Sequence, residues 1–385
     1  MLIVRSPVRI SFGGGGTDLP VYYEKYGGSI LSTSINKYFY TILSRRDDDH
    51  IQIISSDLRA IENWSNLAYM VVKGTKLELP LAVLQSLQHH VAVNLFLASE
   101  IPPGTGLGSS ATVCVNLLKA LTTYLHIKMS KYELAEKAFE IARHVLGKPV
   151  GKQDEYASAF GGLNFIRIDT DGKTRVEPVN VVRDARRELN QNLMLFFTGT
   201  ARDSGAILRE QEKSSQHEGR AVTALHEIRS LAEKMRKALV SGDLNKFGQL
   251  LDDAWQAKKR VSNKISNTGI DELYELAKSK GALGGKITGA GGGGFMLLYC
   301  EKPRQQGIRD AFMVRDIPEM RFECESEGAQ VIVNDPFLDG NGGPGLRWNL
   351  VWDAPFKTSP NYSATPKRML LSDASNRSNI FRETL

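Results

Sequence analysis

Apolar residues recur at two different periods along the chain, and the balance between the periods changes near residue 190. Residues 1–185 mix strand-like runs with two stretches at helical spacing. After residue 190, one strand-like run leads into a series of helical stretches. The expected helices are 109–126, 131–146, 204–214, 218–240, 243–262 and 270–281. The expected strands are "LIVRSPVRISF", "YFYTILSRR", "HIQIISS", "HHVAVNLFLASE", "GGLNFIRID", "NLMLFFTG" and "VIVND". The pattern predicts an α+β protein in two parts.

The last segment differs from the rest of the chain. Residues 339–385 are rich in Gly, Pro, Ser and Asn and show little periodicity, yet they hold Trp348 and Trp352, two of the 4 tryptophans. A fully disordered tail rarely carries such bulky apolar residues. We therefore predict three segments: an N-terminal domain over 1–185, a C-terminal domain over 186–338 and an irregular extension over 339–385.

Composition places the chain among ordinary globular proteins, with 42% hydrophobic and 24% charged residues. The 49 basic and 43 acidic residues give a net charge of +6 without a long basic block, which suits anionic small ligands and does not predict nucleic-acid binding. The 3 cysteines lack C-x-x-C spacing, which favours a reducing compartment, and Cys114 is expected as a small buried helix residue. The 7 histidines show no metal-ligand spacing.

The expected location is the cytoplasm, because no segment has the pattern of a signal peptide or the length of a membrane span. The expected partner is a small molecule, with neither nucleic acid nor membrane. A homodimer remains an open alternative.

A glycine-rich loop precedes the first long helix, in "IPPGTGLGSSAT". Glycines at 104, 106 and 108 leave the backbone bare, and a helix start presents unpaired amides and a positive dipole end, so the stretch is suited to an anion. The alternative is a tight turn that caps the helix with Ser109 or Ser110. The run matches neither the G-x-G-x-x-G dinucleotide pattern nor the Walker pattern.

Two further stretches are equally rich in glycine: "SPVRISFGGGGTDLP" (6–20) and "KITGAGGGGF" (286–295). A structural turn seldom needs more than one or two glycines, so both loops are expected to approach a ligand closely. Flexible linkers are the alternative, although strand-like segments flank both runs.

Taken together and in their order along the chain, the three motifs resemble those of the GHMP kinases, over residues 1 to about 338. Within that superfamily the chain is most similar to the heptose 7-phosphate kinases and the fucokinase-like sugar kinases, through "FGGGGTDLPVYYEKYGG", "GKQDEYASAFGG" and "FTGTARDSGAIL". The resemblance implies the GHMP kinase fold, in which a domain like ribosomal protein S5 domain 2 packs against a ferredoxin-like domain. It also implies ATP-dependent phosphorylation of a sugar hydroxyl, with the anomeric hydroxyl of a heptose 7-phosphate as the expected acceptor. The alternatives are a fucokinase-like kinase of a neutral sugar, or a catalytically weakened regulator that binds nucleotide or sugar.

The resemblance also assigns the nucleotide site. It implies that the glycine loop binds the phosphates of ATP and that the hydroxyl of Ser110 binds Mg²⁺ or the phosphates. The ATP-binding residues it implies are Pro103, Gly104, Gly106, Leu107, Gly108, Ser109, Ser110 and Ala111.

Two residues match the catalytic positions of galactokinase-like members. Asp154 would orient the attacking hydroxyl and accept its proton, and Arg9 would keep that carboxylate ionised. A lone aspartate ahead of a helix would otherwise be interpreted as an N-cap.

The acceptor site is implied to combine the first and third motifs with the stretch "TGTARDSG". Asp18 is the expected ligand of sugar hydroxyls, and Arg202 is expected to hold the distal phosphate, with a surface salt bridge as its alternative. The acceptor residues implied are Gly15, Gly16, Thr17, Asp18, Arg202, Ser204, Gly289, Ala290 and Gly291.

One position departs from the family pattern. Many relatives place a metal-binding glutamate in a stretch like "EIER", whereas this chain reads "EIARHVLG" and has Ala142 there. Glu140 lies on a different face of the expected helix and cannot replace it. The sequence leaves two alternatives: Mg²⁺ held by Ser110, phosphates and water, or weakened activity.

Overall fold

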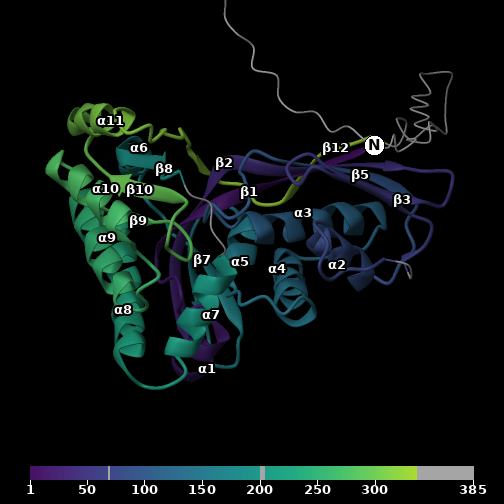
Figure 1. Ribbon diagram of the computed structural model, residues 1–385, viewed down its shortest axis with the longest axis horizontal. Helices are drawn as coiled ribbons and strands as arrows, with labels where there is room; N and C mark the ends of the chain where they lie inside the picture. The colour runs from purple at the N-terminus through teal and green to yellow at the C-terminus, as the bar shows by residue number, and fades with distance from the viewer. Residues whose placement is uncertain (68–69, 200–203, 336–385) are drawn as a thin grey trace, which may run out of the picture. The chain divides into compact units, whose positions relative to one another are not determined.

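A computed structural model describes residues 1–67, 70–199 and 204–335, and these form two β-sheets with helices packed against them (Figure 1). The larger sheet has the strand order β12-β1-β2-β5-β3-β4; in addition, β6 and β11 pair with β2, and β7 pairs with β6. Its strands are β1 (Leu2–Gly13), β2 (Gly28–Arg45), β3 (Ile51–Ser55), β4 (Ala60–Trp64), β5 (Val93–Ser99), β6 (Leu163–Ile168), β7 (Thr174–Pro178), β11 (Cys324–Glu325) and β12 (Gln330–Asn334). The predicted α+β class is confirmed.

The length of β2 organises this sheet. Over its first half, residues 28–33, β2 pairs with β6, and over its second half, residues 39–45, it pairs with β5, while β1 runs antiparallel along most of it. The last two described strands return to this sheet, because β11 pairs with β2 and β12 pairs with β1. The division of the chain at residue 185 remains a prediction.

Helices cover the larger sheet on the side where α2, α3 and α4 lie together (Figure 1). These and their neighbours are α1 (Pro20–Tyr26), α2 (Glu78–Ser86), α3 (Ser109–Tyr124), α4 (Lys131–Glu140) and α5 (Gln153–Phe160). The chain continues from α4 into a π-helix, Ile141–Val145, so the helix predicted over 131–146 is wider in its last part than a regular α-helix.

The smaller sheet, β8-β10-β9, is antiparallel and carries the C-terminal helices. Its strands are β8 (Leu193–Phe197), β9 (Gly284–Ile287) and β10 (Phe295–Tyr299). The helices are α6 (Arg183–Asn192), α7 (Ser204–Ser214), α8 (Arg220–Ser241), α9 (Leu244–Lys259), α10 (Thr268–Ser279) and α11 (Gln305–Met313), with a short 3-10 helix at Lys302–Arg304. The apolar face predicted for 218–240 is buried in α8, at Val222, Leu225, Ile228, Leu231, Met235 and Leu239.

Strand β1 connects the two halves of the core. Its burial alternates at first and becomes continuous from Ser6 onward, because helices pack on both of its faces there. Phe12 meets Phe247 of α9 edge to face at 5.2 Å between ring centroids. The second motif follows β1 directly, so this packing fixes where that motif lies.

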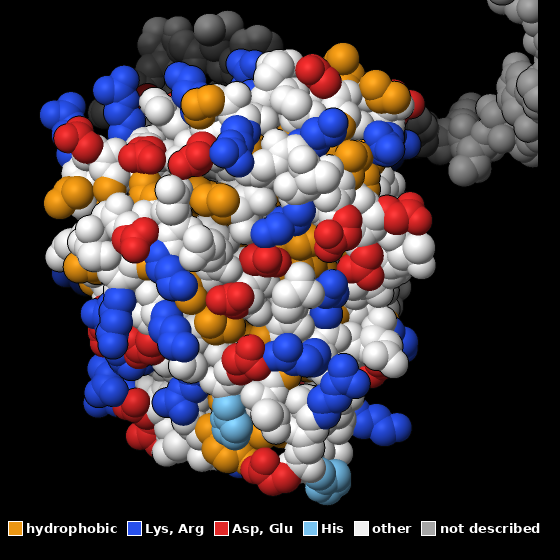
Figure 2. All heavy atoms as spheres, turned by 90° about the vertical axis from the view of Figure 1, so that its left-hand side faces the viewer, with side chains coloured by type: hydrophobic (Ala, Val, Ile, Leu, Met, Phe, Trp, Pro, Cys, Tyr) orange, Lys and Arg blue, Asp and Glu red, His pale blue; other side chains and the backbone are white. Residues whose placement is uncertain are grey.

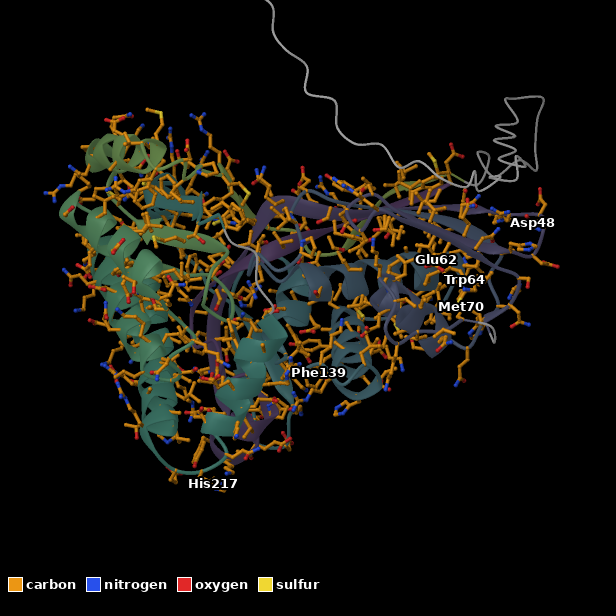
Figure 3. The ribbon with its side chains drawn as sticks, in the orientation of Figure 1. Asp48, Glu62, Trp64, Met70, Phe139 and His217 are labelled. Atoms are coloured by element: carbon orange, nitrogen blue, oxygen red, sulfur yellow. The ribbon has the colours of Figure 1, made fainter. Side chains whose placement is uncertain are left out.

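A separate apolar cluster covers the end of the larger sheet that carries β3, β4 and β5. Met70 is buried there, and Trp64 packs against the same apolar cluster (Figure 3). Cys114 is buried in that cluster as expected, and burial raises the pKa of its thiol. This cluster is separate from the one that contains the apolar residues of α8 and α9.

Charges are mixed on the face that carries α8, α9 and α10, where Lys, Arg, Asp and Glu side chains alternate and apolar side chains stand singly (Figure 2). The net positive charge is therefore not concentrated on this surface. Among the described helices, none is both long and apolar enough to cross a membrane. The extension 339–385, with Trp348 and Trp352, lies outside the described residues.

Candidate functional site

The three glycine-rich motifs meet around one cavity of about 440 Å³. The end of β1, the loop before α3, the start of α5, helix α7 and the loop after β9 all contribute to its walls. The predicted site residues that line it are Arg9, Gly15, Gly16, Asp18, Gly104, Gly106, Gly108, Ser109, Ser110, Ala111, Asp154, Ser204, Gly289 and Ala290. Segments separated by more than a hundred residues thus share one site.

The remaining predicted residues lie elsewhere. Leu107 and Thr17 are fully buried, and Pro103 lines a second cavity. Gly291 lies against Ile265, where an added Cβ would come within 2.8 Å of the Ile265 carbonyl oxygen. Arg202 lies outside the described residues.

The loop before α3 has the backbone that its glycines suggest. Gly104, Gly106 and Gly108 have φ of 77°, 87° and 79°, values that L-residues with a Cβ rarely adopt. Gly108 is the N-cap of α3, and no side chain caps the helix. The alternative, a tight turn in which Ser109 or Ser110 caps α3, is therefore not observed. The uncapped first turn opens on the cavity, where Ser109, Ser110 and Ala111 lie.

The third motif packs against the loop before α3. Some glycines of both segments are needed for this contact alone. A Cβ on Gly106 would lie 2.4 Å from the Thr288 carbonyl oxygen, and one on Gly294 would lie 2.3 Å from that of Thr105. Phe295 also donates its backbone N–H to the Thr105 carbonyl over 3.2 Å. Close approach of two loops therefore requires these glycines, whatever ligand lies beside them, and Gly106→Val would disturb the fold.

Arg9 connects Asp154 to the glycine loop before α3. Its Nε and Nη2 donate to the two carboxylate oxygens of Asp154, each over 2.7 Å, and its Nη1 donates to the Gly106 carbonyl, also over 2.7 Å. The Arg9 side chain is 4% exposed and that of Asp154 is 30% exposed. The carboxylate is thus held in a fixed orientation and still faces the cavity. Asp154 is the second residue of α5 and caps no helix, so the N-cap alternative does not apply.

Asp18 lies beside this pair and is bound to backbone amides. Its carboxylate accepts from the N–H of Gly16 over 2.8 Å and from that of Gln153 over 3.2 Å. Burial raises the pKa of Asp18, the nearby charge of Asp154 adds to the rise, and the backbone N–H donors oppose it. The side chain therefore lines the cavity as a restrained oxygen acceptor.

Sequence reasoning missed the cationic side of the cavity, which comes from helices of the C-terminal half. Arg209 of α7 and Lys258 of α9 line it, and Lys258 donates to the Gly15 carbonyl over 3.0 Å. Lys286 is buried behind them, and desolvation, with the charges of Lys258 and Arg9, lowers its pKa to about 7. The glycine spacing of the third motif does not identify Lys286, and the packing of α9 on β9 brings this lysine close to Lys258.

Replacing Lys286 by methionine is expected to change how stability depends on pH. The folded protein holds fewer protons than the unfolded chain between the lowered pKa, about 7, and the ordinary value of 10.5, so wild-type stability rises with pH across this window. The variant lacks this rise, which amounts to up to about 1.4 kcal/mol in the free energy of unfolding per pH unit. Urea unfolding from pH 6 to 9.5 measures the difference, with exposed Lys234→Met as the control. Parallel curves for wild type and Lys286→Met would contradict the assignment.

Position 142, where the sequence departs from the family pattern, lies in the wall of the main cavity. Ala142 lies in the π-helix and lines the cavity, and Glu155 of α5 lines the same cavity at 1% exposure. Burial and the neighbouring charge of Asp154 raise the pKa of Glu155 well above its ordinary value. Glu140 pairs with Lys137 over 3.1 Å on the exposed side, as its helical face suggests. No cluster of three or more His, Cys, Asp or Glu side chains suited to a metal occurs within the described ranges.

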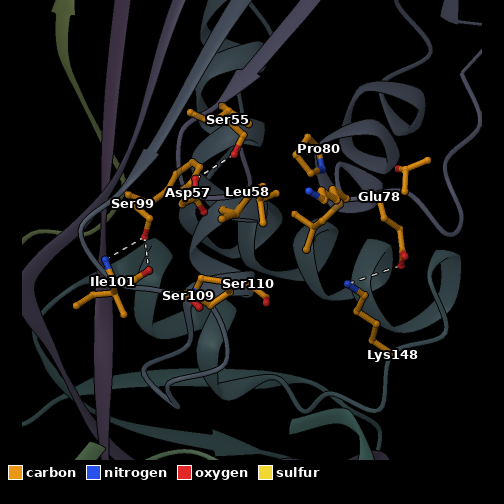
Figure 4. A pocket seen from close by; sticks show the side chains of 17 residues that line it. Ser55, Asp57, Leu58, Glu78, Pro80, Ser99, Ile101, Ser109, Ser110 and Lys148 are labelled. Atoms are coloured by element: carbon orange, nitrogen blue, oxygen red, sulfur yellow. Dashed lines mark hydrogen bonds and ion pairs between the residues drawn. The ribbon is translucent and has the colours of Figure 1, made fainter. Parts of the chain in front are cut away.

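A second, smaller cavity of about 200 Å³ adjoins the first through Ser109 and Ser110 (Figure 4). Apolar side chains make up much of its wall, among them Phe39, Leu58, Leu79, Pro80, Leu97 and Val113. Lys148 stands at its edge, 3.7 Å from Glu78. A flat apolar group attached to an anion could occupy both cavities at once, with the anion at the start of α3.

Comparison with known proteins gives consistent results for both halves of the chain. The family model described as GHMP kinases N terminal domain matches residues 67–162, and the one described as GHMP kinases C terminal matches 235–314. A D-glycero-alpha-D-manno-heptose 7-phosphate kinase of Campylobacter jejuni is 30% identical over 331 residues, 85% of this chain and 97% of that protein.

Two further relatives extend the comparison. The crystal structure of a D-glycero-D-manno-heptose 1-phosphate kinase from Bacteroides thetaiotaomicron has a TM-score of 0.73 and 27% identity, and covers 87% of this chain and 100% of that one. An L-fucokinase/L-fucose-1-P guanylyltransferase of Bacteroides fragilis is 25% identical over 330 residues, 78% of this chain and 34% of that protein.

Proposed function

The chain belongs to the GHMP kinases and is an ATP-dependent sugar kinase, and from that premise we propose that it phosphorylates the anomeric hydroxyl of a heptose 7-phosphate. The observation that carries the choice of acceptor is the cationic wall of the cavity. Arg209 of α7 and Lys258 of α9 line it from two helices. A neutral sugar does not need this charge, whereas a phosphorylated one matches it.

In the proposed complex, ATP lies across the two cavities. The backbone amides from Gly106 to Ala111 and the first turn of α3 bind its phosphates, since both present donors to the cavity. The base occupies the smaller cavity beside Pro103 and Leu58. Ser109 and Ser110, which line both cavities, lie where the two parts of the nucleotide join.

Transfer follows from the Arg9 and Asp154 pair. The Asp154 carboxylate accepts the proton of the anomeric hydroxyl while that oxygen forms a bond to the γ-phosphorus and the bond to the ADP oxygen breaks. Arg9 orients the carboxylate through two hydrogen bonds and fixes the phosphate loop through a third. Asp18, restrained by two backbone amides, accepts from sugar hydroxyls and holds the ring.

We include Mg²⁺ in this proposal because the cavity offers oxygen ligands. Mg²⁺ bound to ATP neutralises phosphate charge and is held through one or two carboxylates together with phosphates and water. Ser110 and a buried carboxyl, Glu155, line the same cavity, so the donor set of this chain fits such an ion.

A panel of acceptors tests the assignment. The protein is incubated with ATP, Mg²⁺ and a heptose 7-phosphate, the corresponding neutral heptose, fucose or galactose, and ADP release is measured for each. We expect the highest kcat/KM with the heptose 7-phosphate, and phosphorus NMR should place the new phosphate on the anomeric oxygen. A preference for fucose would support the fucokinase alternative, and no turnover with any sugar would contradict the proposal.

Removing the charge of Arg209 should separate phosphorylated from neutral acceptors. Loss of a charge-assisted contact of about 1.5–3 kcal/mol is expected to raise KM for the heptose 7-phosphate by roughly ten- to a hundredfold in Arg209→Gln. The KM for the neutral heptose should hardly change. Arg260→Gln is the matched control, since Arg260 is exposed at the C-cap of α9 and pairs with Glu227. Equal effects on both acceptors would mean that Arg209 does not contact the phosphate. Arg202, which lies outside the described residues, remains predicted to hold the distal phosphate.

A further inference from the structure

The side chain that this site leaves unexplained is Glu155. It is 1% exposed and lines the main cavity, immediately after Asp154 on α5. Its Oε2 is buried and has no hydrogen-bond partner in the part of the chain that the structure describes. A buried carboxyl oxygen without a partner costs free energy, so such an atom calls for a ligand or another specific reason.

Position 142 supplies a second, independent observation. Ala142 lines the same cavity from the π-helix, and a methyl group there offers no oxygen to any ion. Glu140, the nearest acidic residue along the chain, is turned outward and paired with Lys137. Apart from Asp18, bound to backbone amides, and Asp154, bound to Arg9, Glu155 is the acidic side chain among the residues that line this cavity.

We propose that Glu155 holds the Mg²⁺ of bound ATP in this protein, with Ser110, and so takes the part that a carboxylate at position 142 cannot take. The inference rests on the ATP-dependent kinase activity and does not depend on which sugar is the acceptor. The missing partner of Oε2 is then the metal ion. The small side chain at 142 leaves space in the cavity wall that a larger acidic residue there would fill.

The alternative is a neutral carboxyl that merely fills space between α5 and α3. Glutamine is nearly isosteric with a neutral carboxyl, so Glu155→Gln would then leave metal and nucleotide binding unchanged. A metal ligand behaves differently, because the amide carries no charge for the ion. The two roles therefore predict different results from one substitution.

Calorimetry with AMP-PNP and no sugar tests the proposal, in Mg²⁺ and again in EDTA. For Glu155→Gln we expect the affinity for AMP-PNP in Mg²⁺ to fall at least about tenfold, as for loss of groups that support a metal site. In EDTA the affinity should stay the same or rise, because a negative charge near the phosphates has been removed. Glu140→Gln should match wild type in both conditions.

Moving the carboxylate provides the rescue. The double variant Ala142→Glu with Glu155→Gln should regain most of the gain in AMP-PNP affinity that Mg²⁺ gives the wild type. Equal losses in Mg²⁺ and EDTA for Glu155→Gln, or no loss in either, would overturn the assignment. A failed sugar panel with these binding results intact would refute only the proposed acceptor.

A structural measurement on the wild type keeps the proposal testable if Glu155→Gln does not fold. Crystals of the full chain with Mn²⁺ and AMP-PNP locate the metal by its anomalous signal. A Glu155 oxygen within about 2.2 Å of the metal supports the proposal. A metal held by Ser110, phosphates and water alone contradicts it.

Discussion

Replacing Asp154 by asparagine is expected to lower kcat by about 100- to 10,000-fold, the range of a general base. Asparagine keeps the shape and one oxygen acceptor for Arg9, but it cannot take the proton of the acceptor hydroxyl. The dissociation constant for AMP-PNP should stay within about threefold of wild type, because the phosphate loop before α3 is unchanged. Steady-state kinetics and calorimetry measure the two quantities on the same preparation.

The control for this prediction is the same change in an ion pair far from the cavity. Asp169 pairs with Arg175 at the surface over 2.8 Å, and Asp169→Asn should leave kcat unchanged. If Asp154→Asn lost AMP-PNP binding along with turnover, the role of Asp154 would be to hold the nucleotide site together. An unchanged kcat would exclude it as the base.

The second large effect is expected at Arg9. Lysine keeps the charge but cannot reproduce three hydrogen bonds in a fixed plane, two to Asp154 and one to the Gly106 carbonyl. Arg9→Lys should lower kcat by about a hundredfold through misplacement of the carboxylate. It should also raise the KM for ATP, since the loop that Gly106 belongs to loses its tie. Loss of a buried charge-assisted bond should lower the free energy of unfolding by about 1.5–3 kcal/mol.

A double-mutant cycle checks whether Arg9 acts through Asp154. Residues that act as one unit give non-additive losses, so Arg9→Lys combined with Asp154→Asn should have a kcat close to that of Asp154→Asn alone. The rise in KM for ATP should persist in the double variant, because it arises from the bond to Gly106. Multiplicative losses in kcat would show that Arg9 stabilises the transferred phosphate independently of Asp154.

Local patterns in the sequence were sufficient for the long elements and for the backbone of the glycine-rich loop before α3. Helix α8 formed where apolar residues recur at helical spacing, because that spacing places them on one face whatever the surroundings. The loop before α3 adopts positive φ at Gly104, Gly106 and Gly108 because only glycine adopts it without strain. Short helices such as α2 and α5 were missed, since their stability comes from packing and not from a long periodic run.

The site was only partly accessible from the sequence. The motifs identified Arg9, Asp154 and Asp18, and those three line one cavity. Lys258 and Lys286 were missed because glycine spacing does not identify them, although Lys286 begins the third motif, and their proximity depends on α9 packing against β9.

Glu155, the metal ligand that we propose, shows the same division. The sequence by itself determined that residue 142 is alanine and that Glu140 lies on another helical face, since both follow from residue identity and helical period. It did not determine that Glu155 lines the cavity with Ala142, because that requires a π-helix to join α4 to the loop before α5. Contacts between residues distant in sequence arise from burial of shared apolar surface, and only the tertiary structure decides which polar side chains this packing brings together.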